Sequence, residues 1–284
     1  MNTGNRLIRG FGVLCAVVFA VGLAATTHGG PIRTDGEGGG AHGNARVIPP
    51  ASMPYGKSYG DWGAAWWQYV FSVPWSINPL NDQTGANFAS GQSGDVWFLA
   101  GTVCAGQACN LASATRTCTL PPGKALFIPI LNTECSTFEG NGTTEAELLA
   151  CATSAVDVAT ALECDVDGVQ IQNLQAYRAH SGLFTWGPLP ADNVFTGLGV
   201  PPDQAPAGTT SPAVQDGYYI MLAPLEAGSH TIHFHGAYDG FFALDVTYNL
   251  NVRRMAAAST ATVAPAGVAT ARRTTWGGIK SIYR

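Results

Sequence analysis

The segment Met221–Val252, MLAPLEAGSHTIHFHGAYDGFFALDVTYNLNV, carries the clearest structural pattern of the chain. After Phe241, apolar and polar residues alternate strictly as far as Val252. A period of two over this length is typical of a β-strand with one buried face and one solvent-facing side. The residues predicted to face inward are Phe242, Leu244, Val246, Tyr248, Leu250 and Val252. The pattern therefore predicts a half-buried strand near the end of the folded region.

A second strand precedes it. Ser229 to His235 show the same alternation, which places His233 and His235 together on the solvent-facing side. The residues from Gly236 to Gly240 suit a hairpin loop between the two strands. Further apolar runs upstream lead to one fold class: an all-β fold with minor helices. We expect an antiparallel β-sandwich, immunoglobulin-like or jelly-roll-like, with two helical insertions.

The two ends of the chain differ from its middle. Residues 1–25 combine Arg6 and Arg9, an apolar run and small residues, which is typical of a secretory signal peptide. The run is shorter than the roughly 20 residues that span a membrane, so we expect no stable membrane span in the mature protein. Residues 26–52 are Gly-rich and predict a flexible leader. We expect a secreted protein, or one located in the periplasm or at the cell surface.

Residues 53–252 are the predicted sandwich domain. Residues 253–284 form a basic, low-complexity tail that ends in WGGIKSIYR. Because the tail lies outside the alternating strands, we expect it to be detachable and to be read by a sorting component.

Two helices and several buried strands are predicted within the domain. The first helix follows Ser58 or Asp61 and stops at Pro74; its aromatic face should pack at one end of the sandwich. The second runs from Thr143 or Thr144 to Leu162. The buried strands are expected at 96–103, 125–131 and 214–222, with residues 104–118 as an excursion clamped by its own cysteines.

Six cysteines remain beyond the predicted signal peptide, and an even number in an exported protein indicates disulfides. They are Cys104, Cys109, Cys118, Cys135, Cys151 and Cys164. A zinc site is disfavoured because no CxxC spacing is present. We expect Cys135 to pair with Cys151 and Cys104 with Cys109, with Cys118 and Cys164 completing the framework.

Charge is distributed unevenly. All 19 acidic residues lie at or before Asp245. The charged residues of the tail after Val252 are all basic. An acidic body repels nucleic acid and anionic membranes, so neither is an expected partner of the folded domain.

Several motifs occur together between Tyr59 and Val252. They are YGDWGAAWWQYVFSVP, QSGDVWFLAG, PPGKALFIPILNTEC and GSHTIHFHGAYDGFFALDVTYNLNV. Together they resemble a family of uncharacterised secreted bacterial proteins with a WWQ helix, a QxGxVWFLAG strand and a PGKALF strand. The resemblance implies one exported domain and no particular activity. The closing TWGGIKSIYR is similar to short C-terminal segments of exported bacterial proteins.

The one candidate for chemistry is the His-x-His strand. If the hairpin pairs His235 with Phe241, Asp245 lies diagonally beside His233, and Asp239 in the loop adds another oxygen. Such a set suits zinc or another divalent transition metal. The motif resembles the metal strands of cupins and multicopper oxidases, but the second histidine motif of either family is missing. The alternative is that both rings are simply solvated.

Two functions therefore remain open. We favour a non-catalytic, exported binding or structural domain that requires no cofactor and contacts an unknown extracellular ligand through the loops carrying Trp186 and Phe195. The alternative is a metal-dependent extracellular enzyme or metal binder that uses His233 and His235.

Overall fold

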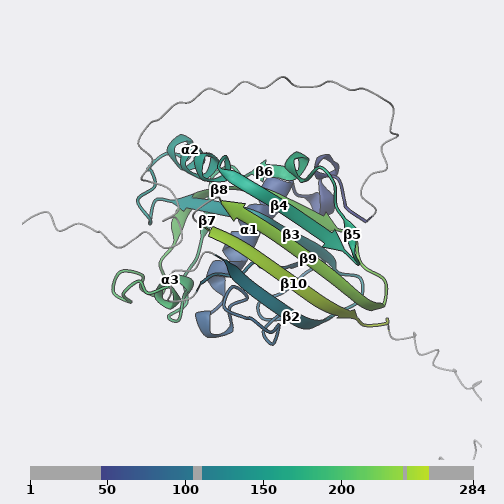
Figure 1. Cartoon of the computed structure of the whole chain (residues 1–284). Helices are drawn as coiled ribbons and strands as arrows, with labels where there is room; N and C mark the ends of the chain where they lie inside the picture. Colours follow the sequence, from purple (N-terminus) through teal and green to yellow (C-terminus); the bar gives the residue numbers. More distant parts are fainter. Residues whose placement is uncertain (1–45, 105–110, 239–241, 256–284) are drawn as a thin grey trace, which may run out of the picture. The chain divides into compact units, whose positions relative to one another are not determined.

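The computed structural model describes residues 46–104, 111–238 and 242–255, and within these ranges ten strands form two five-stranded sheets (Figure 1). Sheet A contains β1 (Val96–Phe98), β3 (Ala125–Ser136), β6 (Arg178–His180), β7 (Phe184–Trp186) and β8 (Ser211–Leu222). Sheet B contains β2 (Ala112–Leu120), β4 (Ala159–Val166), β5 (Val169–Gln170), β9 (Gly228–Tyr238) and β10 (Phe242–Val252). The predicted all-β sandwich with minor helices is confirmed.

The two sheets differ in strand order but share one apolar core. Sheet A runs β1-β3-β8-β6, with β7 also paired to β8, and sheet B runs β2-β10-β9-β4-β5. Most neighbours are antiparallel, as expected, but β1 pairs with β3 and β2 pairs with β10 in parallel. The apolar core lies between the sheets: Ile128 and Ile220 from sheet A meet Ile232, Phe234 and Val246 from sheet B, all fully buried. Burial of this apolar area is the main favourable term in folding.

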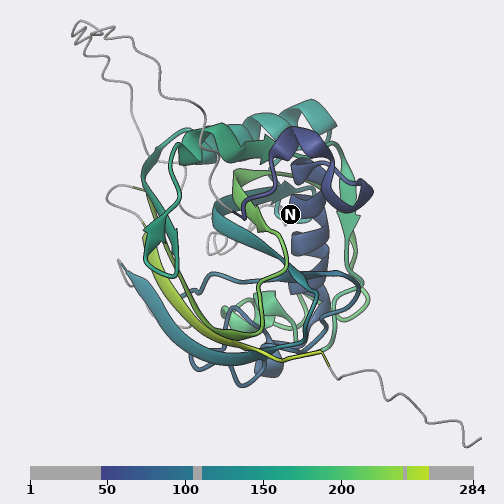
Figure 2. The same cartoon turned by 90° about the vertical axis from the view of Figure 1, so that its right-hand side faces the viewer.

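Helix α1 (Tyr59–Ser72) covers the outer face of sheet A; it does not plug an end of the sandwich (Figure 2). It begins at Ser58, whose side chain forms a capping box with Asp61. Close packing depends on glycine: a Cβ added at Gly60 would lie 2.0 Å from the backbone oxygen of His180. The molecule therefore has three layers: sheet B, sheet A and α1.

Helix α2 (Glu145–Val156) is shorter than predicted, because Ala159–Val166 forms strand β4. Backbone pairing with β9 overrides the helical pattern of these residues. Thr144 caps α2, as one of the two predicted candidates. A third helix, α3 (Val194–Gly197), and 3₁₀ turns lie in the connections; the turns are Pro50–Ser52, Pro54–Gly56, Trp75–Ile77 and Leu174–Tyr177.

The predicted excursion at 104–118 is wrong over its second half, which belongs to the nine-residue strand β2. Buried and exposed positions alternate along the whole strand, with Arg116 and Cys118 among the buried ones. The alternation was missed in the sequence because Arg116, a charged residue, occupies one of the positions that face the core. Its guanidinium donates to the backbone oxygens of Pro79, Asp82 and Gly101 and to the Tyr248 hydroxyl. The long segment before β1 is thereby fixed over the inner face of β2.

The ordered fold also starts before residue 53. Val47 bridges to Leu222, and the backbone N–H of Ile48 donates to the Met221 oxygen. The leader prediction, which extended to Ser52, was therefore too long, because Val47 and Ile48 add backbone pairing at the end of β8. At the other end, one compact unit runs as far as Arg254, and only Met255 of the unit that follows is described. No helix in the described ranges is long and apolar enough to cross a membrane.

Candidate functional site

The β9–β10 hairpin decides which side chains meet the two histidines. Tyr238 lies opposite Phe242, so His235 faces Asp245 and His233 faces Thr247. The predicted register, with His235 opposite Phe241, is wrong because β9 continues to Tyr238 and the connection is shorter than expected. Asp239 lies outside the described residues.

On its other side β9 pairs with β4, which sequence reasoning did not connect to the histidines. Asp165 lies opposite His233, and Glu163 lies opposite His235. We call the set His233, His235, Asp245, Asp165 and Glu163 the His–Asp cluster. Its members stand on the outer face of sheet B, partly or fully exposed to solvent. Only the strand pairing reveals it, because β4 is distant in sequence.

Both ring nitrogens of His233 face carboxylates. Nδ1 lies 3.1 Å from Asp165 Oδ2, and Nε2 lies 3.4 Å from Asp245. Burial alone lowers the pKa of His233, but the hydrogen bonds and negative charges of Asp245 and Asp165 outweigh this and raise it. Two acids therefore favour the protonated form of the His233 ring. Nδ1 of His235 lies 3.8 Å from Asp245 Oδ2 and makes no hydrogen bond among the described residues.

This arrangement differs from the predicted metal centre. Within the described ranges, no group of three or more His, Cys, Asp or Glu side chains is arranged to hold a metal ion. His230 takes no part in the cluster, in keeping with its predicted opposite orientation; its Nδ1 lies 2.8 Å from Asp167 Oδ2. The zinc site stays a prediction.

Beyond the cluster, the outer face of sheet B carries rows of hydroxyl and amide groups. The pairing of β2 with β10 and of β10 with β9 aligns Thr117, Asn249 and Thr231 in one row across three strands. We call these outward side chains, together with the His–Asp cluster, the polar face. Its further members are Ser113, Thr115, Thr119, Thr247, Asn251 and Ser229. Neighbouring rows lie about 6.7 Å apart along the strands, and neighbouring strands about 4.8 Å apart.

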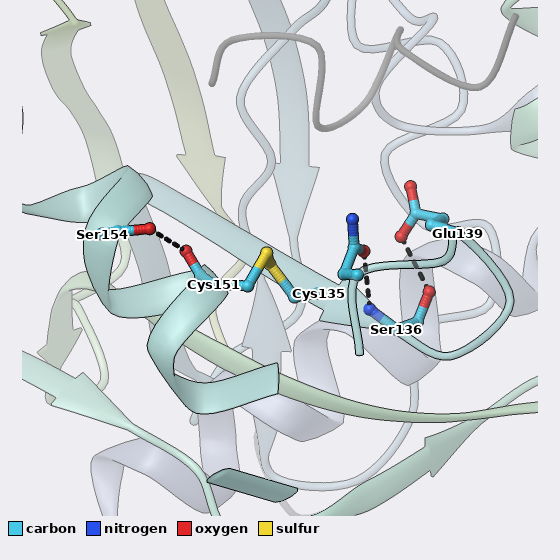
Figure 3. The surroundings of a disulfide bond; sticks show 6 residues. Cys135, Ser136, Glu139, Cys151 and Ser154 are labelled. Atoms are coloured by element: carbon cyan, nitrogen blue, oxygen red, sulfur yellow. Dashed lines mark hydrogen bonds between the residues drawn. A yellow bond between two sulfur atoms is a disulfide. The ribbon is translucent and has the colours of Figure 1, made fainter. Parts of the chain in front are cut away.

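The cysteine framework is confirmed in part. Cys135 and Cys151 form a disulfide that links β3 to α2 (Figure 3). Cys104 is also disulfide-bonded, and its expected partner Cys109 lies outside the described residues.

Cys118 and Cys164 are free thiols buried in the core, so their predicted place in the framework is wrong. They lie on β2 and β4, which β10 and β9 separate within sheet B. Three strand spacings amount to about 14 Å, whereas bridged cysteines have Cα atoms within about 7 Å.

The two aromatic side chains in the loops named as ligand contacts are buried. Trp186 and Phe195 are only 0% and 3% exposed and belong to the core between sheet A and α1. Phe195 stacks on Phe71 with ring centroids 5.3 Å apart, and Phe138 covers both Trp186 and Phe195. As the molecule stands, these rings are packing residues.

Sequence reasoning also missed two carboxyl groups that meet at the end of β3. Glu134 is buried, and its pKa is raised well above the usual range by burial first and then by the charge of Glu139 from the turn that follows. The Ser136 hydroxyl donates to Glu139 Oε2 over 2.8 Å (Figure 3). We call Glu134 and Glu139 the acid pair. Its signal in the sequence was a glutamate three residues after the end of the apolar run Ala125–Leu131.

Comparisons with known proteins add little. No family model and no curated protein sequence matches this chain. The solved structures similar to it include a cysteine protease inhibitor, EhICP2, from Entamoeba histolytica, which is 14% identical; the match covers 51% of this chain and 95% of the inhibitor with a TM-score of 0.19. The solution structure of Amebosin is 14% identical over 51% of this chain and 100% of Amebosin, with a TM-score of 0.16. TM-scores this low define no shared fold, so the function is argued from the site.

Proposed function

We propose that the chain is an exported, non-catalytic binding domain and that the polar face of sheet B is its binding surface. One observation carries the proposal. Both faces of sheet A are covered, by sheet B and by α1, whereas the outer face of sheet B presents exposed polar side chains such as Thr117, Asn249 and Thr231. The Cys135–Cys151 disulfide supports export because such bonds persist in oxidising compartments.

The chemistry of the polar face suits a ligand rich in hydrogen-bonding groups. Its rows consist of hydroxyl and amide groups, which both donate and accept hydrogen bonds. The acidic groups of the polar face are confined to the end that carries the His–Asp cluster, where His233 lies between Asp165 and Asp245. We propose a neutral, hydroxyl-rich polymer, such as an extracellular polysaccharide, as the ligand class.

Co-sedimentation of the purified full chain with insoluble cellulose and chitin tests this. We expect binding to at least one of them and about a tenfold weaker affinity after Thr117→Ala/Asn249→Ala, which removes neighbouring groups from one row. The matched control is Thr185→Ala/Gln204→Ala, which changes exposed residues of β7 and of the connection before β8. Equal binding by both double variants, or no binding by the unchanged chain, contradicts the proposal.

The alternative function is a metal binder or metal-dependent enzyme at the His–Asp cluster. It is favoured by Asp245, whose carboxylate lies within 4 Å of ring nitrogens of both His233 and His235. Calorimetric titration of chelator-treated protein with zinc or copper separates the two functions. Tight binding that is lost in His233→Ala/His235→Ala supports a metal site, whereas equal, weak binding by both proteins leaves the polar face as the functional surface.

A further inference from the structure

Two adjacent arginines follow directly after the last strand. β10 ends at Val252, which is buried and lies opposite Leu120 of β2. The backbone N–H of Arg253 still donates to the Leu120 oxygen. Arg253, Arg254 and Met255 have no regular secondary structure and are all exposed, Met255 to 79%. Because the first compact unit runs as far as Arg254, the exposed arginine pair marks its end.

The guanidinium groups of this pair are available to a partner. Neither forms an ion pair with a residue in the described ranges, whereas Arg46 and Arg178 each pair with aspartate. A guanidinium is a planar fork of N–H donors that matches the geometry of a carboxylate. A carboxylate at the bottom of the substrate pocket is also how trypsin selects a basic residue before the bond that it cuts. The pair therefore suits the substrate cleft of an endoprotease.

The other basic residues of the described ranges are held by the fold. The Arg46 backbone oxygen accepts from the Ala223 N–H, and Lys57 Nζ lies 4.8 Å from the centroid of the Trp62 ring. A protease binds its substrate as an extended segment, so cleavage beside a basic residue of the fold requires local unfolding first. The remaining basic residues lie within strands or directly before one: Arg116, Lys124 and Arg178.

We propose that Arg253 and Arg254 are the recognition site of an endoprotease with acidic substrate pockets, which hydrolyses the peptide bond after Arg254. Water is the co-reactant. Its oxygen bonds to the Arg254 carbonyl carbon, the bond to the Met255 nitrogen breaks, and that nitrogen takes up a proton. The product that ends at Arg254 keeps all the strands described above, so the fold does not oppose the reaction.

The cleavage separates two parts of the chain that differ in charge. All the acidic residues stay with the folded domain, and the charged residues of the released segment are all basic. The released segment is also the one that the sequence suggests as a sorting signal. The proposed step therefore turns a sorted precursor into a free domain, and it is independent of the ligand of the polar face.

Limited proteolysis of the purified full chain tests whether the site is accessible. The probes are trypsin and, separately, an endoprotease specific for paired basic residues, with mass spectrometry of samples taken over time. We expect both to cut after Arg254 at least about tenfold faster than beside any basic residue within 46–252, because only the latter cuts wait for local unfolding. Equally fast cleavage within 46–252, or resistance of the chain to the pair-specific enzyme, overturns the proposal.

Two matched variants show whether the pair itself is recognised. Arg253→Gln/Arg254→Gln should abolish the product that ends at Arg254. The control is Arg272→Gln/Arg273→Gln, which removes the same dipeptide outside the described residues and should leave that product unchanged. Arg253→Gln alone should slow the pair-specific enzyme about tenfold or more while trypsin still cuts after Arg254. If Arg253→Gln leaves the pair-specific enzyme unaffected, the pair is not the recognition site.

The exported protein, isolated from the cells that produce it, tests whether the cleavage occurs during maturation. Its C-terminal peptide is mapped after digestion at acidic residues, so that the mapping itself creates no end at Arg254. We expect the peptide to end at Arg254. Exported protein that all retains Arg284, or ends elsewhere, overturns the proposal. Polysaccharide binding plays no part in these measurements, so their outcome is independent of the proposed function.

Discussion

Arg178 on β6 is ion-paired with residues of two other elements. Its guanidinium binds the buried Asp216 on β8 over 2.6 Å, Asp157 at the end of α2 over 2.7 Å, and the Thr153 backbone oxygen. No sequence pattern predicted these contacts, because the partners lie on two other elements, α2 and β8. The ion pair with Asp216 is partly protected from water, so removing one partner leaves a buried charge uncompensated.

We therefore predict that Arg178→Ala lowers the free energy of unfolding by about 3 kcal/mol. Urea denaturation followed by tryptophan fluorescence measures the change. Arg253→Ala removes an exposed arginine and should change stability by less than about 0.5 kcal/mol. Similar effects of the two substitutions would show that the Arg178 contacts contribute nothing specific.

His233 is expected to make the stability of the fold depend on pH. Its raised pKa means that the folded state binds the proton more tightly than the unfolded chain, whose value is about 6.5. The stabilisation is therefore fully present below pH 6 or so and disappears as the pH rises through the folded value. We expect His233→Gln to be less stable than the unchanged chain at pH 5.5, with the difference shrinking by pH 8.5. Thermal melts at both pH values, with the exposed His180→Gln as control, check this; a difference that is independent of pH contradicts it.

Among the helices and strands, those with a local sequence pattern were predicted correctly. The alternation in β9 and β10 and the capping signals of α1 and α2 were sufficient because they are local. The first half of β4, Ala159–Leu162, was assigned to a helix and β2 to a loop, because pairing with distant strands decided both segments. The same holds for the site: His233 and His235 were visible as a pair, but Asp165 and Glu163 join them only through the β4–β9 register.

The disulfide between Cys135 and Cys151 links two elements, β3 and α2, and its contribution to stability is measurable. Closing a loop of about 15 residues stabilises a fold by about 3 kcal/mol, so we expect Cys135→Ser/Cys151→Ser to reduce stability by that amount. Burial raises the pKa of the Cys118 thiol to about 12 and that of the Cys164 thiol to about 12, so both should be unreactive in the folded state.

Alkylation with iodoacetamide, mapped by mass spectrometry, checks the thiols. Cys118 and Cys164 should be labelled only after unfolding in denaturant without reductant. Labelling of either in the native protein, or resistance of either after unfolding, contradicts the assignment of two buried free thiols.

For the whole molecule, the clearest prediction concerns the C-terminal unit. The backbone N–H of Arg253 still donates to the Leu120 oxygen, whereas the division between units falls after Arg254. We expect deletion of Met255–Arg284 to leave the melting temperature within about 2 °C of the full chain, because the deletion removes no residue of the first unit. Calorimetry of both proteins measures this, and a drop of more than a few degrees would show that the tail packs on the domain.

The parallel pairing of β2 with β10 has a consequence for how the chain folds. Arg116 and Tyr248, which touch across this pair, are 132 residues apart in sequence. Contacts that close such long loops form late and slow the folding of β proteins. Until β10 has been synthesised, β2 has no neighbour in sheet B and the Arg116 guanidinium lacks one of its acceptors. The nascent chain therefore completes its fold only after nearly the whole domain has left the ribosome.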